Sequence, residues 1–148
     1  MGLVRSLVEC MEPPFGVLYV LTVSRTSHQR GRYQNTHSWS RAQLDGFLAR
    51  FADALACDGR HSIWIASTQL DGSYESQVIY DQHDFVYAYG DLERFTSLAQ
   101  ARGLRPGRPA IPCPHEHRYH PKFDLAEQQI LTEYEWTRHD IVEEIDDP

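Results

Sequence analysis

Residues 61–68 have the sequence HSIWIAST, and their side chains follow the period of two that is typical of a β-strand with one face buried. Two more short apolar segments follow, at 78–80 and 85–89. Turn-forming residues separate the three segments, at Asp71-Gly72 and around 82–84. This arrangement predicts three antiparallel strands that are joined as a meander.

A further strand is predicted upstream of the meander. Residues 16–23, GVLYVLTV, form the continuous apolar run that is typical of a central strand. The next segment, 24–39, is polar and has no sustained period, so we expect a long loop there. Much later, prolines interrupt the chain, and any strand at 110–119 should therefore lie at an edge of the sheet.

Two helices have clear start and stop signals. Ser40 and Gln43 match a capping box, apolar residues then recur at three- and four-residue steps, and Gly59 ends the helix. Asp91 can cap a second helix, which Gly103 ends. Both helices therefore lie between or after predicted strands.

The two ends of the chain are less regular. Residues 1–13 form an N-terminal extension whose apolar spacing fits a short amphipathic helix, with a strand as the alternative. Near the other end, Asp124 and Glu127 are expected to be the cap and third position of a last helix, followed by an acidic tail at 140–148.

The order of these elements predicts one α+β domain over residues 1–148. We expect a ferredoxin-like sandwich, with a mainly antiparallel sheet of about five strands and two to four helices. Such folds host many functions, so the function must be inferred from particular residues.

Composition narrows the class of protein. Fourteen Lys and Arg against 21 Asp and Glu give a formal charge of −7, which makes nucleic acid an unexpected partner. No apolar run approaches the length of a membrane span. The three cysteines have no C-x-x-C spacing, which suits a reducing compartment, so we expect a cytoplasmic protein.

The most unusual segment is CPHEHRYH, at 113–120. In an extended chain Cys113, His115 and His117 would point to one face, and His120 could add a ligand. A thiolate and imidazoles can bind zinc or another divalent transition metal, although the spacing matches no familiar zinc motif. Two alternatives stay open, an ordinary edge strand and a neutral histidine that acts as a general base.

Two other groups are candidate ligand sites. Arg25, Arg30 and Arg32 give the polar segment 24–39 a local positive charge that could bind phosphate or carboxylate, although such loops are commonly just solvated. No phosphate-binding glycine motif accompanies them.

The second group is an aromatic stripe. Phe85, Tyr87 and Tyr89 should share one face of a strand, with Trp64 and Tyr80 on neighbouring strands. If exposed, this face could stack bases or other rings. We expect it instead to be covered, by the C-terminal helix or by a second subunit.

Two functional hypotheses follow. The preferred one is a small non-enzymatic module that binds a protein partner, or a second copy of itself, through its sheet face. The alternative is a metal- or histidine-dependent enzyme that acts on a small anionic substrate through residues 113–120, with the arginines orienting the anion. The sequence assigns no catalytic residue.

Overall fold

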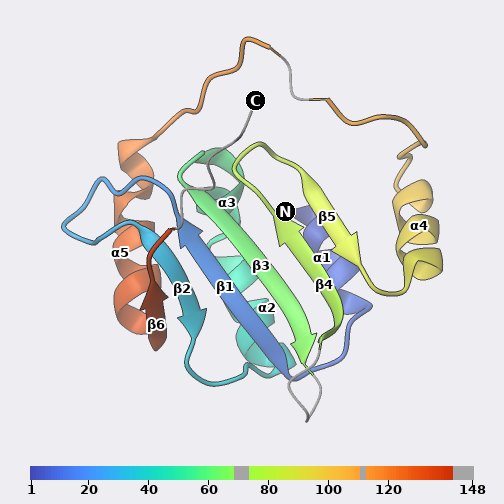
Figure 1. Cartoon of the computed structure of the whole chain (residues 1–148), viewed down its shortest axis with the longest axis horizontal. Coiled ribbons are helices and arrows are strands. Elements are labelled where there is room, and N and C mark those ends of the chain that lie inside the picture. The colour runs from blue at the N-terminus through green and yellow to red at the C-terminus, as the bar shows by residue number, and fades with distance from the viewer. Residues whose placement is uncertain (69–73, 111–112, 142–148) are drawn as a thin grey trace.

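The computed structural model describes residues 1–68, 74–110 and 113–141. It contains a six-stranded sheet in the order β5-β4-β3-β1-β2-β6, in which every neighbouring pair is antiparallel (Figure 1). The strands are β1 Phe15–Leu21, β2 Gly31–Asn35, β3 His61–Thr68, β4 Tyr74–Tyr80, β5 Val86–Tyr89 and β6 Trp136–His139. The predicted α+β class with an antiparallel sheet is confirmed. The sheet has six strands instead of five, and the ferredoxin-like arrangement is not confirmed.

The meander from β3 to β5 and the central strand β1 are confirmed, although the predicted turn at Asp71-Gly72 lies outside the described residues. The expected loop 24–39 is wrong in part, because it contains β2. Of the inward residues of β2 only Tyr33 is large and apolar, whereas Asn35 uses its side-chain amide to bond to the backbone of β1. A strand with so few apolar residues gives no alternating pattern.

The last strand also differs from the prediction. No strand is present in the described part of 110–119, and β6 instead follows the last helix and pairs with β2. The chain between α4 and α5 runs irregularly past one end of the sheet (Figure 1). The proline-rich sequence of this connection removes the backbone donors that a strand needs.

Helices cover one face of the sheet and its two edges (Figure 1). They are α1 Gly2–Glu9, α2 Arg41–Arg50, α3 Ala52–Cys57, α4 Leu92–Ala101, the single 3₁₀ turn η1 Pro121–Phe123, and α5 Asp124–Glu133. The N-terminal segment is helical, and both predicted caps are confirmed, the capping box at Ser40 and the Asp91 cap. The first long helix is divided at Phe51 into α2 and α3.

The predicted cap of α5 is wrong. Asp124 is the first residue of α5, which has no side-chain cap at this end, and Glu127 is fully buried. The Glu127 carboxylate accepts hydrogen bonds from Arg60 Nη1 at 2.6 Å, from the Ser24 hydroxyl at 2.6 Å and from the Thr26 hydroxyl at 2.7 Å. Since a buried carboxylate needs such partners, Glu127 links α5 to the loop before β3 and to the loop after β1.

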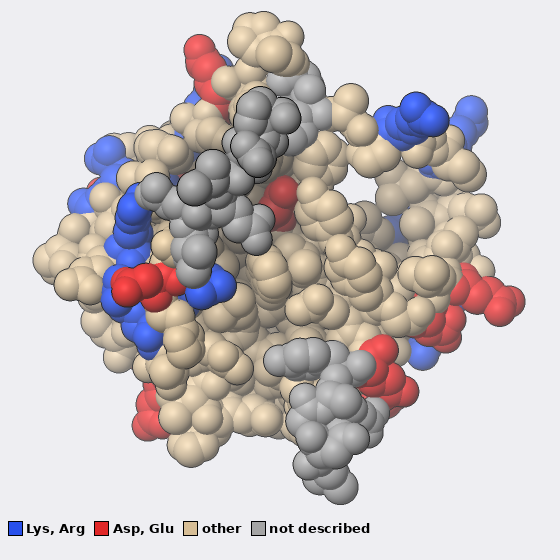
Figure 2. Space-filling model, in the orientation of Figure 1, with Lys and Arg blue, Asp and Glu red and all other residues tan. Residues whose placement is uncertain are grey.

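The core lies between the sheet and the helices. Strand β1 alternates buried and half-buried residues, and the buried side chains of α1 and α2 belong to the same apolar cluster. The opposite face of the sheet has no described helix over it. Mostly uncharged side chains occupy the centre of this open face, with an acidic side chain towards its upper end, and Lys and Arg gather with some acidic residues over its β2–β6 side (Figure 2).

No described helix has the length and apolar character needed to cross a membrane. The three cysteines, Cys10, Cys57 and Cys113, are free thiols.

Candidate metal centre

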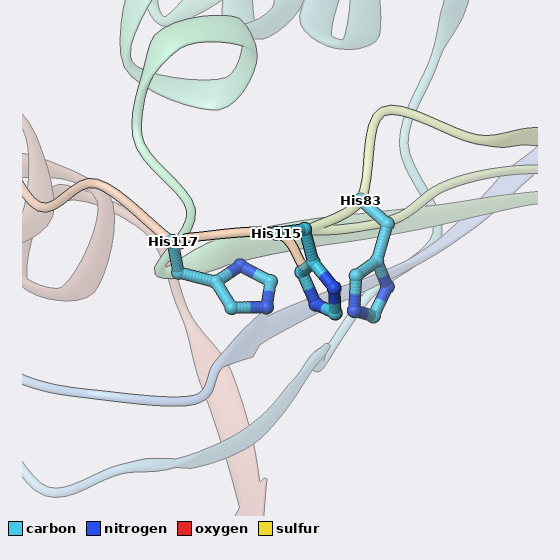
Figure 3. A group of neighbouring side chains, drawn as sticks. All are labelled: His83, His115 and His117. Atoms are coloured by element: carbon cyan, nitrogen blue, oxygen red, sulfur yellow. The ribbon is translucent and has the colours of Figure 1, made fainter. Parts of the chain in front are cut away.

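Three histidines from two distant segments meet at one end of the sheet (Figure 3). His83 comes from the turn between β4 and β5, whereas His115 and His117 come from the connection between α4 and α5. One possible ligand atom from each of the three residues lies within 4.8 Å of the other two. The ring of His83 lies 4.9 Å from that of His117 and 5.5 Å from that of His115, between centroids.

The turn that carries His83 is held by its own side chains. Asp81 Oδ1 accepts hydrogen bonds from the backbone N–H groups of His83 at 2.9 Å and Phe85 at 3.0 Å. Asp84 has a positive φ of 65°, a conformation that Asp tolerates better than most residues, and its carboxylate accepts a hydrogen bond from the Tyr80 hydroxyl. The backbone position of His83 is therefore well defined.

The segment that carries His115 and His117 is attached to the loop between α3 and β3. Gly59 N–H donates to the carbonyl of Arg118 at 3.1 Å, and His120 N–H donates to Asp58 Oδ2 at 3.1 Å. A Cβ at Gly59 would lie only 3.1 Å from His117 Nδ1, so the absence of a side chain there lets the imidazole pack closely. These contacts bring the segment to the β4–β5 turn.

Asp58 is itself fixed by Arg60, whose side chain is fully buried. Arg60 Nε donates to Asp58 Oδ1 at 2.9 Å and Arg60 Nη2 donates to Asp58 Oδ2 at 2.8 Å. This fork-to-fork pair has the geometry of strong charge-assisted hydrogen bonds. The same arginine also binds Glu127, so one buried cation supports both the histidine segment and α5.

The histidine group could hold a metal ion. Imidazole ligands suit zinc, copper, iron and nickel. The nitrogens of a tetrahedral zinc site, with bonds of about 2.0–2.1 Å, lie roughly 3.4 Å apart, so modest side-chain rotations would close this group around an ion. His115 is exposed and the other two are half-buried, which leaves room for such rotations.

Carboxylates surround the histidines. Asp81 Oδ2 lies 3.5 Å from His83 Nδ1, the arrangement in which a carboxylate orients a metal-binding imidazole. Next to His117, a cleft of about 260 Å³ is also lined by Asp81, Asp84 and Glu116. Arg118 also lines the cleft, but the carboxylates outnumber it, so the local charge favours a cation.

The structure brings together only two of the four metal ligands that the sequence suggested. His115 and His117 lie together, but neither Cys113 nor His120 belongs to the group, and the ring of His120 lies against Phe123 at 6.2 Å between centroids. The described residues of the segment form no strand that would align Cys113 with the two histidines.

His83 is the residue that sequence reasoning missed, because its turn was explained by backbone requirements alone. Asp is common in tight turns, but a turn does not require a histidine. The imidazole between Gln82 and Asp84 was therefore a usable signal.

A shallow groove of about 500 Å³ lies on the open face beside the histidines. Of the predicted ligand-binding residues, Arg32, Trp64, Tyr87 and Tyr89 line it together, and His83 lines it as well. The residue pairing places Trp64, Ile79 and Tyr87 in one row across β3, β4 and β5.

Other parts of the predicted ligand sites lie elsewhere. Tyr80 points into the core, because successive residues of a strand face opposite sides of the sheet and its neighbour Ile79 lines the groove. Arg25 Nε binds Asp124 Oδ1 at 3.2 Å, and neither Arg25 nor Arg30 lines the groove. The C-terminal helix does not cover the aromatic residues, since its Ile130 is buried in the core on the other side of the sheet.

Comparisons with family models, with curated proteins and with solved structures find no match for this chain.

Proposed function

We propose that the chain is a zinc-dependent enzyme whose metal ligands are His83, His115 and His117. The observation that supports this proposal is the convergence of three imidazoles from two segments more than 30 residues apart. Zinc sites with four protein ligands are mainly structural, whereas three protein ligands and an open position are typical of catalytic zinc. We propose a reducing, cytoplasmic location for this enzyme, which suits its three free thiols.

The surrounding residues have separate roles in this proposal. Asp81 orients His83 through Nδ1, and this leaves Nε2 to face the ion. Zinc would supply an activated water for hydrolysis at the open position. Glu116 and Asp84, which line the neighbouring cleft, are candidates for the general base.

The first test is the zinc content of the purified, tag-free chain, followed by titration of the zinc-free protein. We expect about one ion per chain. Replacing His83, His115 or His117 individually by Ala should weaken zinc binding by at least about tenfold, because each change removes a ligand.

Matched controls separate this site from the one that the sequence suggested. Cys113→Ser and His120→Ala change residues outside the group, and His37→Ala changes an exposed histidine that lies near Glu135. All three should bind zinc like the unchanged chain. Zinc binding that persists in every variant of the proposed ligands would refute the site.

A second candidate is a binding module that acts through the open face of the sheet. The observation that favours it is the exposure of Trp64, Tyr87 and Tyr89, at 40%, 43% and 54%, on a face that no described helix covers. One occupant of such a face is a second copy of the chain. That form of the module requires a dimer in light scattering, and a constant monomer mass up to high concentration would exclude it.

A further inference from the structure

We infer that the groove on the open face binds a small ligand in which a planar ring and an anionic group lie close together. This inference deepens the second candidate above and does not depend on zinc. The groove has a volume of about 500 Å³, within the range of roughly 300–1,000 Å³ that is usual for small-molecule sites. Val20, Ser62 and Ile79, on three adjacent strands, contribute to its lining.

The aromatic part of the groove can hold a ring. Trp64 and Tyr87 lie in the same row with Ile79 between them, and Tyr89 lies one step further along β5 on the same face. All three rings are between 40% and 54% exposed. Exposed aromatic side chains on a rigid sheet stack with planar ligands, because every aromatic ring offers a polarisable face.

The charged part of the groove is Arg32. The residue pairing places β2 two strands away from β3, so Arg32 and Trp64 are attached to strands that are roughly 10 Å apart. Arg32 Nε bonds to the backbone just after β6, which is on the side of β2 away from Trp64, yet both residues line the same groove. A ligand whose anionic group lies a few atoms away from its ring would therefore contact both side chains.

Like Arg41 and Arg94, which also bond to backbone carbonyls, Arg32 has no carboxylate partner among the described residues, but it is the arginine that lines the groove. Arg25, Arg50 and Arg138 each have a carboxylate partner. Arg32 Nε instead donates to the backbone carbonyl of Asp140 at 3.1 Å, and no ion pair to Arg32 is present among the described residues. A ligand carboxylate or phosphate would supply the charge that this guanidinium can bind at two points.

The charge of the whole chain limits the ligand to a small anion. With a formal charge of −7, the protein repels a polyanion, and one guanidinium offers too few phosphate contacts for a nucleic acid. Asp81 also lines the groove, but it follows β4, three strands away from β2. A single anionic group beside Arg32 is therefore governed mainly by the guanidinium, because salt screens the more distant charges.

The test is isothermal titration of the zinc-free chain, residues 1–148, at 150 mM salt. Adenosine 5′-monophosphate is the phosphate probe and 2-naphthoate is the carboxylate probe. Their uncharged partners are adenosine and 2-naphthamide, and ribose 5-phosphate lacks an aromatic ring. We expect at least one charged aromatic probe to bind at least about tenfold more tightly than its uncharged partner, and ribose 5-phosphate to bind least.

Matched variants test the proposed contacts of the ring with Trp64 and of the anionic group with Arg32. Trp64→Leu and Arg32→Gln should each weaken binding of the charged probe by about tenfold or more. Tyr119→Leu and Arg108→Gln, which change exposed residues outside the groove, should leave binding unchanged. Thermal unfolding of each variant confirms that it is folded.

Several results would overturn the inference: no binding of either charged probe, equal binding of charged and uncharged partners, or full binding by Trp64→Leu. Tighter binding of a single-stranded oligonucleotide with a steep salt dependence would replace it with nucleic-acid binding. Because the titrations use zinc-free protein and are repeated in His117→Ala, the groove and the zinc site can each fail without the other.

Discussion

His61 lies fully buried at the start of β3, and its ring is 5.7 Å from that of Tyr19 between centroids. The Tyr19 hydroxyl lies 2.7 Å from His61 Nδ1, whereas Nε2 is buried without a hydrogen-bond partner. Burial lowers the pKa of His61 from 6.5 to about 4, because the charged imidazolium would lose its hydration; Asp58 opposes this effect and Arg60 adds to it. The imidazole is therefore neutral in the folded chain near pH 7.

This neutral histidine predicts a loss of stability in mild acid. Between pH 6.5 and about 4 the unfolded chain binds a proton at His61 that the folded chain does not bind, so the free energy of unfolding falls as the pH falls. The full shift corresponds to about 3 kcal/mol. Urea unfolding at pH 7, 6, 5 and 4 measures it.

His61→Gln is the comparison, since Gln can still bond to the Tyr19 hydroxyl but does not titrate. Between pH 7 and 4 the unchanged chain should lose about 3 kcal/mol more than the variant, and carboxylates that titrate in both proteins cancel in the difference. Parallel stability curves would show that the folded state accommodates the charged imidazole.

At the scale of elements, Gly90 joins β5 to α4. Its φ is +128°, and a Cβ there would lie 2.7 Å from Ser76 Cβ and 3.0 Å from Ser76 Cα. Gly90→Ala should therefore destabilise the fold by about 1–3 kcal/mol, from backbone strain and from the clash with β4. The change in the midpoint of urea unfolding measures the effect.

Gly46 is the matched control for this substitution. It lies inside α2, and a Cβ there would have no atom within 4 Å. Gly46→Ala should stabilise the chain by about 0.5–1 kcal/mol, because Ala loses less backbone entropy in a helix. Effects of the same sign at both glycines would contradict the description of the β5–α4 junction.

The elements also show what the sequence could reveal. Strands β1 and β3 were predictable, because their own side chains supply the apolar face that they bury. Strands β2 and β6 were not, because each is short and polar and depends on its neighbours, as Asn35 does when it bonds to the backbone of β1. Local patterns cannot show such partners.

The same distinction applies to the candidate metal centre. His115 and His117 were noticeable because they are crowded into one segment with a thiol and a third histidine. His83 meets them because two hydrogen bonds, from Gly59 N–H to the Arg118 carbonyl and from His120 N–H to the Asp58 carboxylate, hold a distant connection against the loop before β3. The sequence also suggested that Asp124 caps the last helix with Glu127 at its third position, whereas in the fold the Glu127 carboxylate binds Arg60.

At the scale of the whole molecule, the connection between α4 and α5 crosses from one edge of the sheet to the other (Figure 1). Its described contacts with the rest of the fold include the two hydrogen bonds at Gly59 and Asp58. A zinc ion bound by His83, His115 and His117 would add a second attachment, from the middle of the connection to the β4–β5 turn. Zinc should thus hold this connection against the sheet.

Limited digestion with trypsin measures that attachment. Arg118 is exposed and follows directly after His117, so cleavage there requires the segment to leave its site. A ligand at 100 times its dissociation constant lowers the population of a state that cannot bind it by about 100-fold, so cleavage at Arg118 should slow by up to that factor. Arg5, which is exposed in α1 on another part of the fold, is the internal reference and should be cut at an unchanged rate.

His83→Ala keeps the whole cleavage segment but loses one proposed ligand, so zinc should no longer protect Arg118 in this variant. Equal protection of both proteins would mean that zinc acts on the protease or at another site, and protection of the unchanged chain alone would show that the ion joins the two segments.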